Sequence, residues 1–124
     1  MLIRDLKTAT YFETTDGTFI CELLHPHREE KDIKINFSIA HAILGPEESS
    51  HPHRIKSAGE IYFILEGKGL MHIDNQQALL EPGQLVYIPP GSMQFIKNVS
   101  SGELKFLCMV SPPWRKEDDE ICLE

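Results

Sequence analysis

The chain has few cysteines and no long apolar run, and both features exclude classes of protein. Cys21, Cys108 and Cys122 are its only cysteines, widely scattered and without a Cys-x-x-Cys spacing. An odd, scattered set is not a disulfide framework and is typical of a reducing compartment. No apolar run approaches the roughly 18 residues of a membrane span, and no charged start precedes an apolar stretch. We therefore expect a cytoplasmic protein that is neither secreted nor membrane-spanning.

Positive charge is also scarce. Lys and Arg together number 12 against 19 Asp and Glu, which gives a formal net charge of -7. Without a basic patch to neutralise phosphates, nucleic acid is not an expected partner. The 41% hydrophobic and 25% charged content is that of an ordinary globular protein, and 124 residues are enough for one domain but not for two. We expect a single domain over residues 1–124.

The middle of the chain lacks the pattern of a long helix and carries strand patterns instead. From Ile33 to Leu44, apolar residues and one histidine, His41, alternate with more polar ones, which predicts a half-buried strand. Shorter apolar runs follow at 60–65, 70–73, 78–80, 85–88, 94–99 and 104–110, and turn residues at 74–77 predict a hairpin. Seven or eight short strands with frequent turns are typical of an antiparallel barrel or jelly roll, so we predict an all-β fold.

The two ends of the chain have different patterns. Residues 1–24 contain short apolar runs that predict additional strands at a sheet edge, either within the chain or across a dimer, and residues 25–31 form a polar loop. The segment after Pro112-Pro113-Trp114 is acidic, and it predicts a short helical turn or a mobile end.

Two short segments contain the residues of a possible metal site. The first contains Gly45, His51, Pro52, His53, Glu60 and Gly67, with five residues between Gly45 and His51 and six on either side of Glu60. The second contains Gly83, Pro89, Gly91, Gln94 and Asn98. Alternate side chains of a strand share a face, so His51 and His53 are expected to project together. Two imidazoles and one carboxylate suit a divalent transition metal and leave positions open for substrate or water.

These spacings resemble the two motifs of the cupin superfamily, specifically those of its small single-domain members. The glycine framework and the whole of the second spacing match, and with the flanking strands the resemblance covers roughly residues 33–111. It implies an antiparallel double-stranded β-helix, or jelly-roll barrel, over 33–111, with N-terminal strands in 1–32 and an acidic tail in 112–124. Pairing through terminal strands, which is frequent in small cupins, implies a homodimer.

Two positions depart from the family pattern. Six residues, 54–59, separate His53 from Glu60 where the family has three or four, which predicts a longer loop at the barrel mouth with the register of Glu60 kept. Gln94 stands where the family has a histidine, and its amide oxygen is a weaker donor that Fe(II), Mn(II) or Zn(II) still accepts. Cupin-type sugar-phosphate isomerases also use a glutamine, at a different position. The resemblance implies one divalent metal (Fe, Mn, Zn or Ni) held by His51, His53, Glu60 and Gln94.

Each of these ligands has a structural alternative. His51 and His53 could be barrel-mouth histidines without a metal. Glu60 could be a buried carboxylate paired with Arg54 or Lys56, an arrangement that persists only when it is fully hydrogen-bonded. Gln94 could hydrogen-bond a metal-bound water or a substrate instead of the metal itself.

Three further features have a functional and a structural interpretation. Tyr62 shares the face of Glu60 by the period of two and is the candidate catalytic acid, with a packed core tyrosine as the alternative. His41 and His72 have the pattern of core histidines. The tetrapeptide His-Pro-His-Arg occurs at both 25–28 and 51–54, but the first copy lacks the preceding glycine and the following strand, so we interpret it as a coincidence.

Three functions remain open at this point. The first is a metal-dependent enzyme acting on a small sugar or organic acid derivative, as a Lewis-acid isomerase, lyase or decarboxylase or as an Fe-dependent oxygenase. The second is a non-catalytic barrel that binds or senses a small ligand, with or without a metal. The third keeps the barrel without a metal and uses histidine as a base. One fold supports all three, so the residues of the site must distinguish them.

Overall fold

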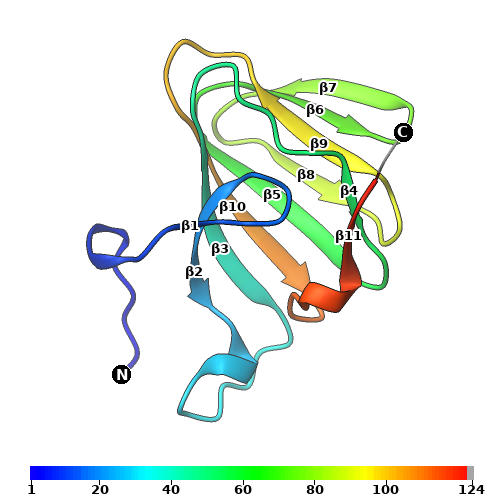
Figure 1. Ribbon diagram of the computed structural model, residues 1–124. Coiled ribbons are helices and arrows are strands. Elements are labelled where there is room, and N and C mark those ends of the chain that lie inside the picture. The colour runs from blue at the N-terminus through cyan, green and yellow to red at the C-terminus, as the bar shows by residue number, and fades with distance from the viewer. Residues whose placement is uncertain (123–124) are drawn as a thin grey trace.

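Two antiparallel sheets form the barrel in the computed structural model, which describes residues 1–122 (Figure 1). The six-stranded sheet has the order β1-β2-β3-β10-β5-β8, and the five-stranded sheet has the order β11-β4-β9-β6-β7. The strands are β1 (Phe12–Glu13), β2 (Phe19–Leu24), β3 (Ser38–Leu44), β4 (His53–Ile55), β5 (Gly59–Glu66), β6 (Gly69–Ile73), β7 (Gln76–Leu80), β8 (Leu85–Ile88), β9 (Gln94–Asn98), β10 (Leu104–Ser111) and β11 (Asp119–Ile121). Short 3₁₀ turns occupy Leu6–Thr8, Pro26–Arg28 and Lys116–Asp118. The predicted all-β jelly roll is confirmed.

The alternation of strand β5 decides which side chains enter the barrel. Glu60, Tyr62 and Ile64 are buried, while Ile61 and Phe63 lie on the opposite face of the sheet. A strand turns successive side chains to opposite faces, so one register places a carboxylate, a phenol and an aliphatic side chain in a row inside. Gly67 ends the strand with φ +83, and a Cβ there would lie 2.5 Å from the carbonyl oxygen of Glu103. Only glycine fits this turn.

The hydrophobic core fills one part of the space between the sheets. Its fully buried members include Leu44, Ile64, Ile96, Leu104 and Phe106. These side chains come from strands of both sheets, so their burial holds the two layers together. The polar side chains of the barrel interior lie where β3 begins and β10 ends, and the site is built there.

The strand expected at Ile33–Leu44 is shorter than predicted, and the face that points into the core is the opposite of the one that its apolar residues indicated. Strand β3 begins only at Ser38, and Ala42 and Leu44 are the side chains that join the core. His41 is buried on the other face, where its Nδ1 lies 2.8 Å from the hydroxyl of Tyr11. Alternation determines which residues share a face of the strand, but it does not determine which of the two faces points into the barrel. At β3 the large core side chains of other strands leave little space. Small residues therefore point inward here.

Both ends of the chain add strands within the same chain. Strand β2 pairs with β3, as the apolar runs near the N-terminus predicted. The acidic tail contains the expected helical turn, at Lys116–Asp118, and Asp119–Ile121 then forms β11, which pairs with β4; residues 123–124 of the tail lie outside the described residues. The acidic residues of this segment did not indicate a strand. Backbone hydrogen bonds to β4 hold it in place although it has few apolar side chains. In the described part of the chain, no helix is long and apolar enough to cross a membrane.

Candidate functional site

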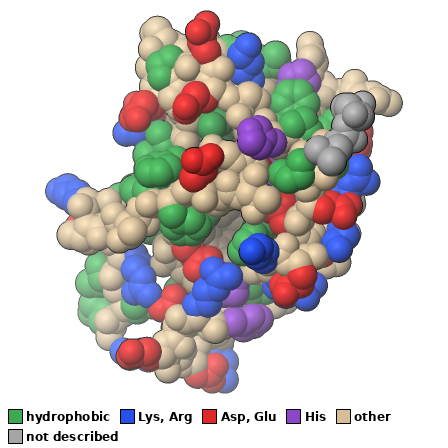
Figure 2. Space-filling view, in the orientation of Figure 1, with side chains coloured by type: hydrophobic (Ala, Val, Ile, Leu, Met, Phe, Trp, Pro, Cys, Tyr) green, Lys and Arg blue, Asp and Glu red, His purple; other side chains and the backbone are tan. Residues whose placement is uncertain are grey.

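A cavity of about 130 Å³ lies inside the barrel, at the end where β3 begins and β10 ends. Figure 2 shows this face of the molecule hollowed near its centre, with hydrophobic and charged side chains around the hollow. The cavity is lined by residues of the β1–β2 turn, the inner faces of β3, β4, β5 and β10, and the C-terminal segment, among them Thr14, Asp16, Ser38, His53, Glu60, Tyr62, Cys108, Trp114 and Asp119.

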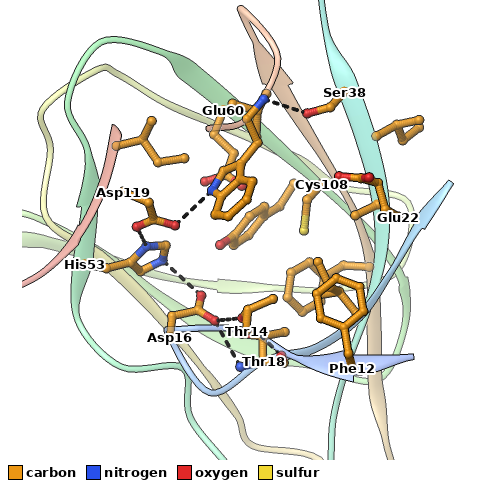
Figure 3. A pocket seen from close by; sticks show the side chains of 18 of the residues that line it. Phe12, Thr14, Asp16, Thr18, Glu22, Ser38, His53, Glu60, Cys108 and Asp119 are labelled. Atoms are coloured by element: carbon orange, nitrogen blue, oxygen red, sulfur yellow. Dashed lines mark hydrogen bonds and ion pairs between the residues drawn. The ribbon is translucent and has the colours of Figure 1, made fainter. Parts of the chain in front are cut away.

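His53 is held between two carboxylates that come from opposite ends of the chain (Figure 3). Its Nδ1 lies 2.9 Å from Oδ1 of Asp119, and its Nε2 lies 3.1 Å from Oδ2 of Asp16. The indole Nε1 of Trp114 donates a hydrogen bond of 3.0 Å to Oδ2 of Asp119, which fixes that carboxylate. The His53 side chain is 4% exposed, so this pairing takes place in a water-poor interior.

The two carboxylates make His53 a cation over a wide pH range. Burial by itself lowers the pKa of the imidazole, but hydrogen bonds and charge from Asp119 and Asp16 outweigh it and raise the pKa to about 10. Burial likewise opposes ionisation of Asp16, and the partnership with His53 lowers its pKa to about 2. Although Nε2 is close enough to Asp16 for an ion pair, it has no hydrogen-bond partner of suitable geometry among residues 1–122.

Asp16 owes its position to a tight turn between β1 and β2. Its Oδ1 accepts hydrogen bonds from the hydroxyl of Thr14 and from the backbone N–H of Thr18. The turn is fastened to the barrel because the backbone N–H of His51 donates to the carbonyl of Asp16 at 2.6 Å. Gly17 supplies the positive φ of +85 that closes the turn. The N-terminal hairpin therefore contributes a side chain to the cavity.

Glu60, Gln94 and Tyr62 form a second polar group in the same interior. The amide nitrogen of Gln94 donates to Oε1 of Glu60 at 2.8 Å, and the hydroxyl of Tyr62 donates to the amide oxygen of Gln94 at 2.9 Å. Gln94 on β9 pairs with His53 on β4, so the two groups sit on adjacent strands. The hydrogen bonds orient the amide so that its nitrogen, not its oxygen, faces the carboxylate.

Burial shifts both acids of this group toward their neutral forms. It raises the pKa of Glu60 to about 7, with the nearby charge of His53 and the hydrogen bond from Gln94 acting in the opposite direction. It also raises the pKa of Tyr62 well above its ordinary value, an effect that the charge of Glu60 reinforces. Glu60 is therefore a carboxyl that changes protonation near neutral pH, in a cavity wall.

Of the four residues expected to bind a metal, the structure brings three together. His53, Glu60 and Gln94 are buried in one interior, while His51 is exposed and packs its ring against Gly17. Strand β4 begins only at His53, so the alternation that would align the two histidines does not extend to His51. Within residues 1–122, no three His, Cys, Asp or Glu side chains lie together as a metal-binding group.

The donor atoms fit a metal in part. Nε2 of buried His53 makes no hydrogen bond of suitable geometry in the described chain and becomes a metal donor once the imidazole gives up its proton, and Glu60 supplies a carboxylate in the same cavity wall. Against this, the amide oxygen of Gln94 already accepts from Tyr62, and His51 points elsewhere. Arg54 and Lys56 do not pair with Glu60, since Arg54 contacts Cys122 and Glu120 and no ion pair of Lys56 is found in the described chain.

Comparison with known proteins identifies the family. The family model of the cupin domain matches residues 40–110, more than half of the chain. The chain belongs to the cupin family. An uncharacterized protein of Methanocaldococcus jannaschii is 40% identical over 108 residues, which are 87% of this chain and 84% of that protein.

Two comparisons with Thermotoga maritima, one of sequence and one of structure, add to this result. An oxalate-binding protein is 28% identical to this cupin over 67 residues, covering 54% of this chain and 55% of its own. The crystal structure of a predicted oxalate decarboxylase superposes with a TM-score of 0.75 at 22% identity, covering 90% of this chain and 99% of that one. The structural similarity shows a shared fold only, and the oxalate in these two names is a statement about the Thermotoga maritima matches, not about this chain.

The sequence did not reveal the partners of His53. Asp16 carries only a turn signal, Asp16-Gly17, and Asp119 lies in a run of acids that is typical of a solvated tail. Cys108 and Trp114 line the cavity without belonging to any motif. Both ends of the chain lie outside the cupin motifs, and nothing in the sequence indicated that they contact His53.

Proposed function

We propose that this cupin binds a small polar metabolite, a sugar or organic acid derivative, in the barrel cavity and acts on it as an enzyme by proton transfer. The observation that carries the proposal is the pair of buried ionisable groups, His53 and Glu60, in the wall of one cavity. Burial and specific partners shift the pKa of both groups: that of Glu60 moves toward neutral pH, as a catalytic acid or base requires, and that of His53 moves up, so that it stays a cation. Glu60, with its pKa of about 7, is the group that gives or takes a proton at neutral pH.

The neighbouring residues have supporting roles in this proposal. Gln94 holds the carboxyl of Glu60 by a hydrogen bond, and Tyr62 holds the amide of Gln94. Tyr62 stays protonated, so it can donate a hydrogen bond but does not serve as a base. His53 is a fixed cation between Asp16 and Asp119, and its Nε2, which makes no hydrogen bond of suitable geometry in the described chain, can donate to a neutral oxygen atom of the substrate.

A metal-dependent enzyme is the second candidate, and Nε2 of His53 favours it, because no hydrogen bond of suitable geometry uses this buried atom in the described chain and a metal would displace its proton. In that case His53, Glu60 and Gln94 would hold one divalent Fe, Mn, Zn or Ni, with His51 as the fourth ligand implied by the family. A bound metal of this kind supplies Lewis acidity or, as Fe, dioxygen chemistry. His51 would have to turn inward from its place against Gly17, and Gln94 would have to release Tyr62.

Metal content separates these two candidates. We would measure metals in the purified protein by plasma mass spectrometry, together with His53→Ala, Glu60→Ala and Gln94→Ala, and with His72→Ala as a matched control on β6. Near one metal per chain, lost in the first two variants and kept in the control, supports the metal-dependent enzyme. A wild-type protein that stays empty after incubation with Fe(II), Mn(II), Zn(II) and Ni(II) rejects it.

Binding without catalysis is the alternative to an enzyme of either kind. Both functions predict that Glu60→Gln alters ligand binding, but only the enzyme converts the ligand into a product. A metabolite that stabilises the protein thermally and is recovered unchanged after long incubation supports the binding module. A product that forms with the wild type and not with Glu60→Gln supports the enzyme. Activity that survives in Glu60→Gln contradicts the proposed role of this residue.

We also propose that the protein is a homodimer that pairs through the outer face of the six-stranded sheet. Two cross-strand rows on that face are apolar: Ile39, Met109, Ile61 and Tyr87 in one, and Leu107, Phe63 and Leu85 in the other, next to His41, which Tyr11 covers. Leu85 and Tyr87 are 55% and 57% exposed. A contiguous apolar patch of this kind on a sheet marks an interaction surface, and a second copy offers the same face.

A further inference from the structure

The cavity wall contains more acidic than basic side chains. Its lining includes four carboxylates, Asp16, Glu22, Glu60 and Asp119, and two basic groups, Arg28 and His53. Whether or not Glu60 carries its proton, the acids outnumber the bases. Charges in a largely buried cavity are weakly screened, so this balance acts directly on whatever enters.

Both basic groups are already engaged by protein carboxylates. The Nη1 of Arg28 donates to the two carboxylate oxygens of Glu22, at 3.0 and 2.8 Å, while the guanidinium lies over the ring of Trp114. His53 is placed between Asp16 and Asp119 (Figure 3). Among residues 1–122, the cavity therefore presents no basic side chain that is free to pair with a carboxylate of a ligand.

The remaining polar atoms are suited to hydroxyl and carbonyl groups. Nε2 of His53 is paired in charge with Asp16 at 3.1 Å but makes no hydrogen bond of suitable geometry in the described chain, so this buried nitrogen can still donate to a neutral acceptor atom of a ligand. Glu60 uses one oxygen for Gln94 and has its other oxygen for a ligand hydroxyl. The rest of the wall, which includes Phe12, Ile20 and Val110, is apolar and suits a short carbon frame.

The volume limits the ligand to a few carbon and oxygen atoms. The cavity measures about 130 Å³. An engineered protein cavity of about 150 Å³ holds one benzene molecule, so a compact molecule of similar bulk fills this one.

We infer that the ligand of this cavity is a small uncharged molecule bearing hydroxyl or carbonyl groups, and not a dicarboxylate such as oxalate. The inference rests on the proposed function, which places the ligand in this cavity, and it names the class of that ligand. An oxalate dianion would face at least three carboxylates, and both cationic side chains of the described cavity wall, Arg28 and His53, are already paired with carboxylates of the protein. The oxalate named for the Thermotoga maritima proteins therefore does not transfer to this chain.

A size-matched titration tests the inference. The chain has a single tryptophan, Trp114, which lines the cavity and reports its occupancy by fluorescence. The purified full-length protein would be titrated with dihydroxyacetone and glycerol as uncharged probes, oxalate and glycolate as anions, and ethanolamine as a cation. We expect an uncharged probe to bind at least about tenfold more tightly than oxalate, which corresponds to about 1.4 kcal/mol. Oxalate or ethanolamine binding as tightly as the best uncharged probe overturns the inference but leaves the cavity as the ligand site.

A charge variant provides a second test. Glu22→Gln removes one wall carboxylate and releases Arg28, and it should raise the affinity for oxalate relative to dihydroxyacetone by about tenfold. The matched control is Glu81→Gln, which removes a surface carboxylate paired with Lys68 and should leave that ratio unchanged. An unchanged ratio in Glu22→Gln contradicts the charge argument. If no probe of any charge alters Trp114 fluorescence, the proposed function fails, and the inference fails with it.

Discussion

Nδ1 of His53 lies 2.9 Å from Oδ1 of Asp119, although the two residues are 66 positions apart in the chain. The contact ties the first residue of β4 to the C-terminal segment, because β4 and β11 are paired at this point. It also defines the ring orientation that leaves Nε2 toward Asp16 and the cavity. The candidate site therefore depends on a segment outside the cupin motifs.

Removing the charge of Asp119 should weaken the site and the fold together. In Asp119→Asn, His53 keeps Asp16 but loses one of its two carboxylates, so we expect its pKa to fall from about 10. Breaking a buried ion pair on one side should cost about 3–5 kcal/mol of unfolding free energy. NMR titration of the imidazole and urea denaturation measure these two effects.

The control for this prediction is Glu120→Gln, which alters the next residue of β11. The Glu120 side chain is 51% exposed and its ion pair with Arg54 is 3.6 Å long, so this change should be almost neutral. An imidazole pKa in Asp119→Asn equal to that of the wild type would show that Asp119 does not hold His53 in solution.

Stability should decrease from mildly acidic to alkaline pH. The pKa of Glu60 is about 7 in the folded protein, against the ordinary value of 4.5 that applies once the chain unfolds, so the folded state keeps a proton that the unfolded chain loses. Stability therefore falls as the pH rises from 4.5 through 7, by on the order of 3 kcal/mol. The ion pairs of His53 act in the same direction, because its folded pKa is raised and their contribution is lost between pH 6.5 and about 10.

The Glu60→Gln variant separates these two contributions. It should flatten the decline in melting temperature below about pH 7 and leave the decline above it, which belongs to His53. Glu66→Gln, at the exposed end of the same strand, is the control and should follow the wild-type profile. A wild-type melting temperature that rises over this range would contradict the raised pKa of Glu60. Below pH 3.8 stability should fall again, because the stabilisation that accompanies the lowered pKa of Asp16 is lost as the pH falls toward about 2.

Tyr62→Phe should destabilise the protein through Gln94. The substitution removes the 2.9 Å hydrogen bond to the amide oxygen and leaves that buried oxygen without a donor, at a cost of about 1–3 kcal/mol. Chemical denaturation measures the loss. Tyr87→Phe is the matched control, because the Tyr87 side chain is 57% exposed and its hydroxyl can be replaced at little cost. Equal stability of the two variants would argue that Gln94 finds another donor.

The proposed dimer can be broken without damaging the barrel. Leu85→Lys combined with Tyr87→Lys places two charges on the exposed outer face of β8, and sedimentation velocity should then report a monomer. Leu79→Lys, which changes a side chain 49% exposed on the other sheet, should remain a dimer. A wild-type monomer rejects the dimer itself, and a double variant that stays dimeric rejects this face as the interface.

The sequence by itself determined the strands and the glycine framework of the barrel. Period-two alternation places Glu60, Tyr62 and Ile64 on one face whatever the tertiary context, and turn residues such as Asp74 and Gly67 adopt backbone conformations that few other residues allow. Local sterics and hydrophobic burial act over a few residues, so the pattern of the chain was sufficient to predict the jelly roll.

Only the tertiary structure decided which side chains meet in the cavity. His51 and His53 have the spacing of strand neighbours, but β4 begins at His53, and the backbone of His51 is used to fasten the Asp16 turn. Asp16 and Asp119 reach His53 from the two ends of the chain because β1, which precedes the Asp16 turn, and β11, which begins at Asp119, are edge strands of the two sheets. Contacts at such separations depend on how edge strands pack, and neither composition nor periodicity contains that information.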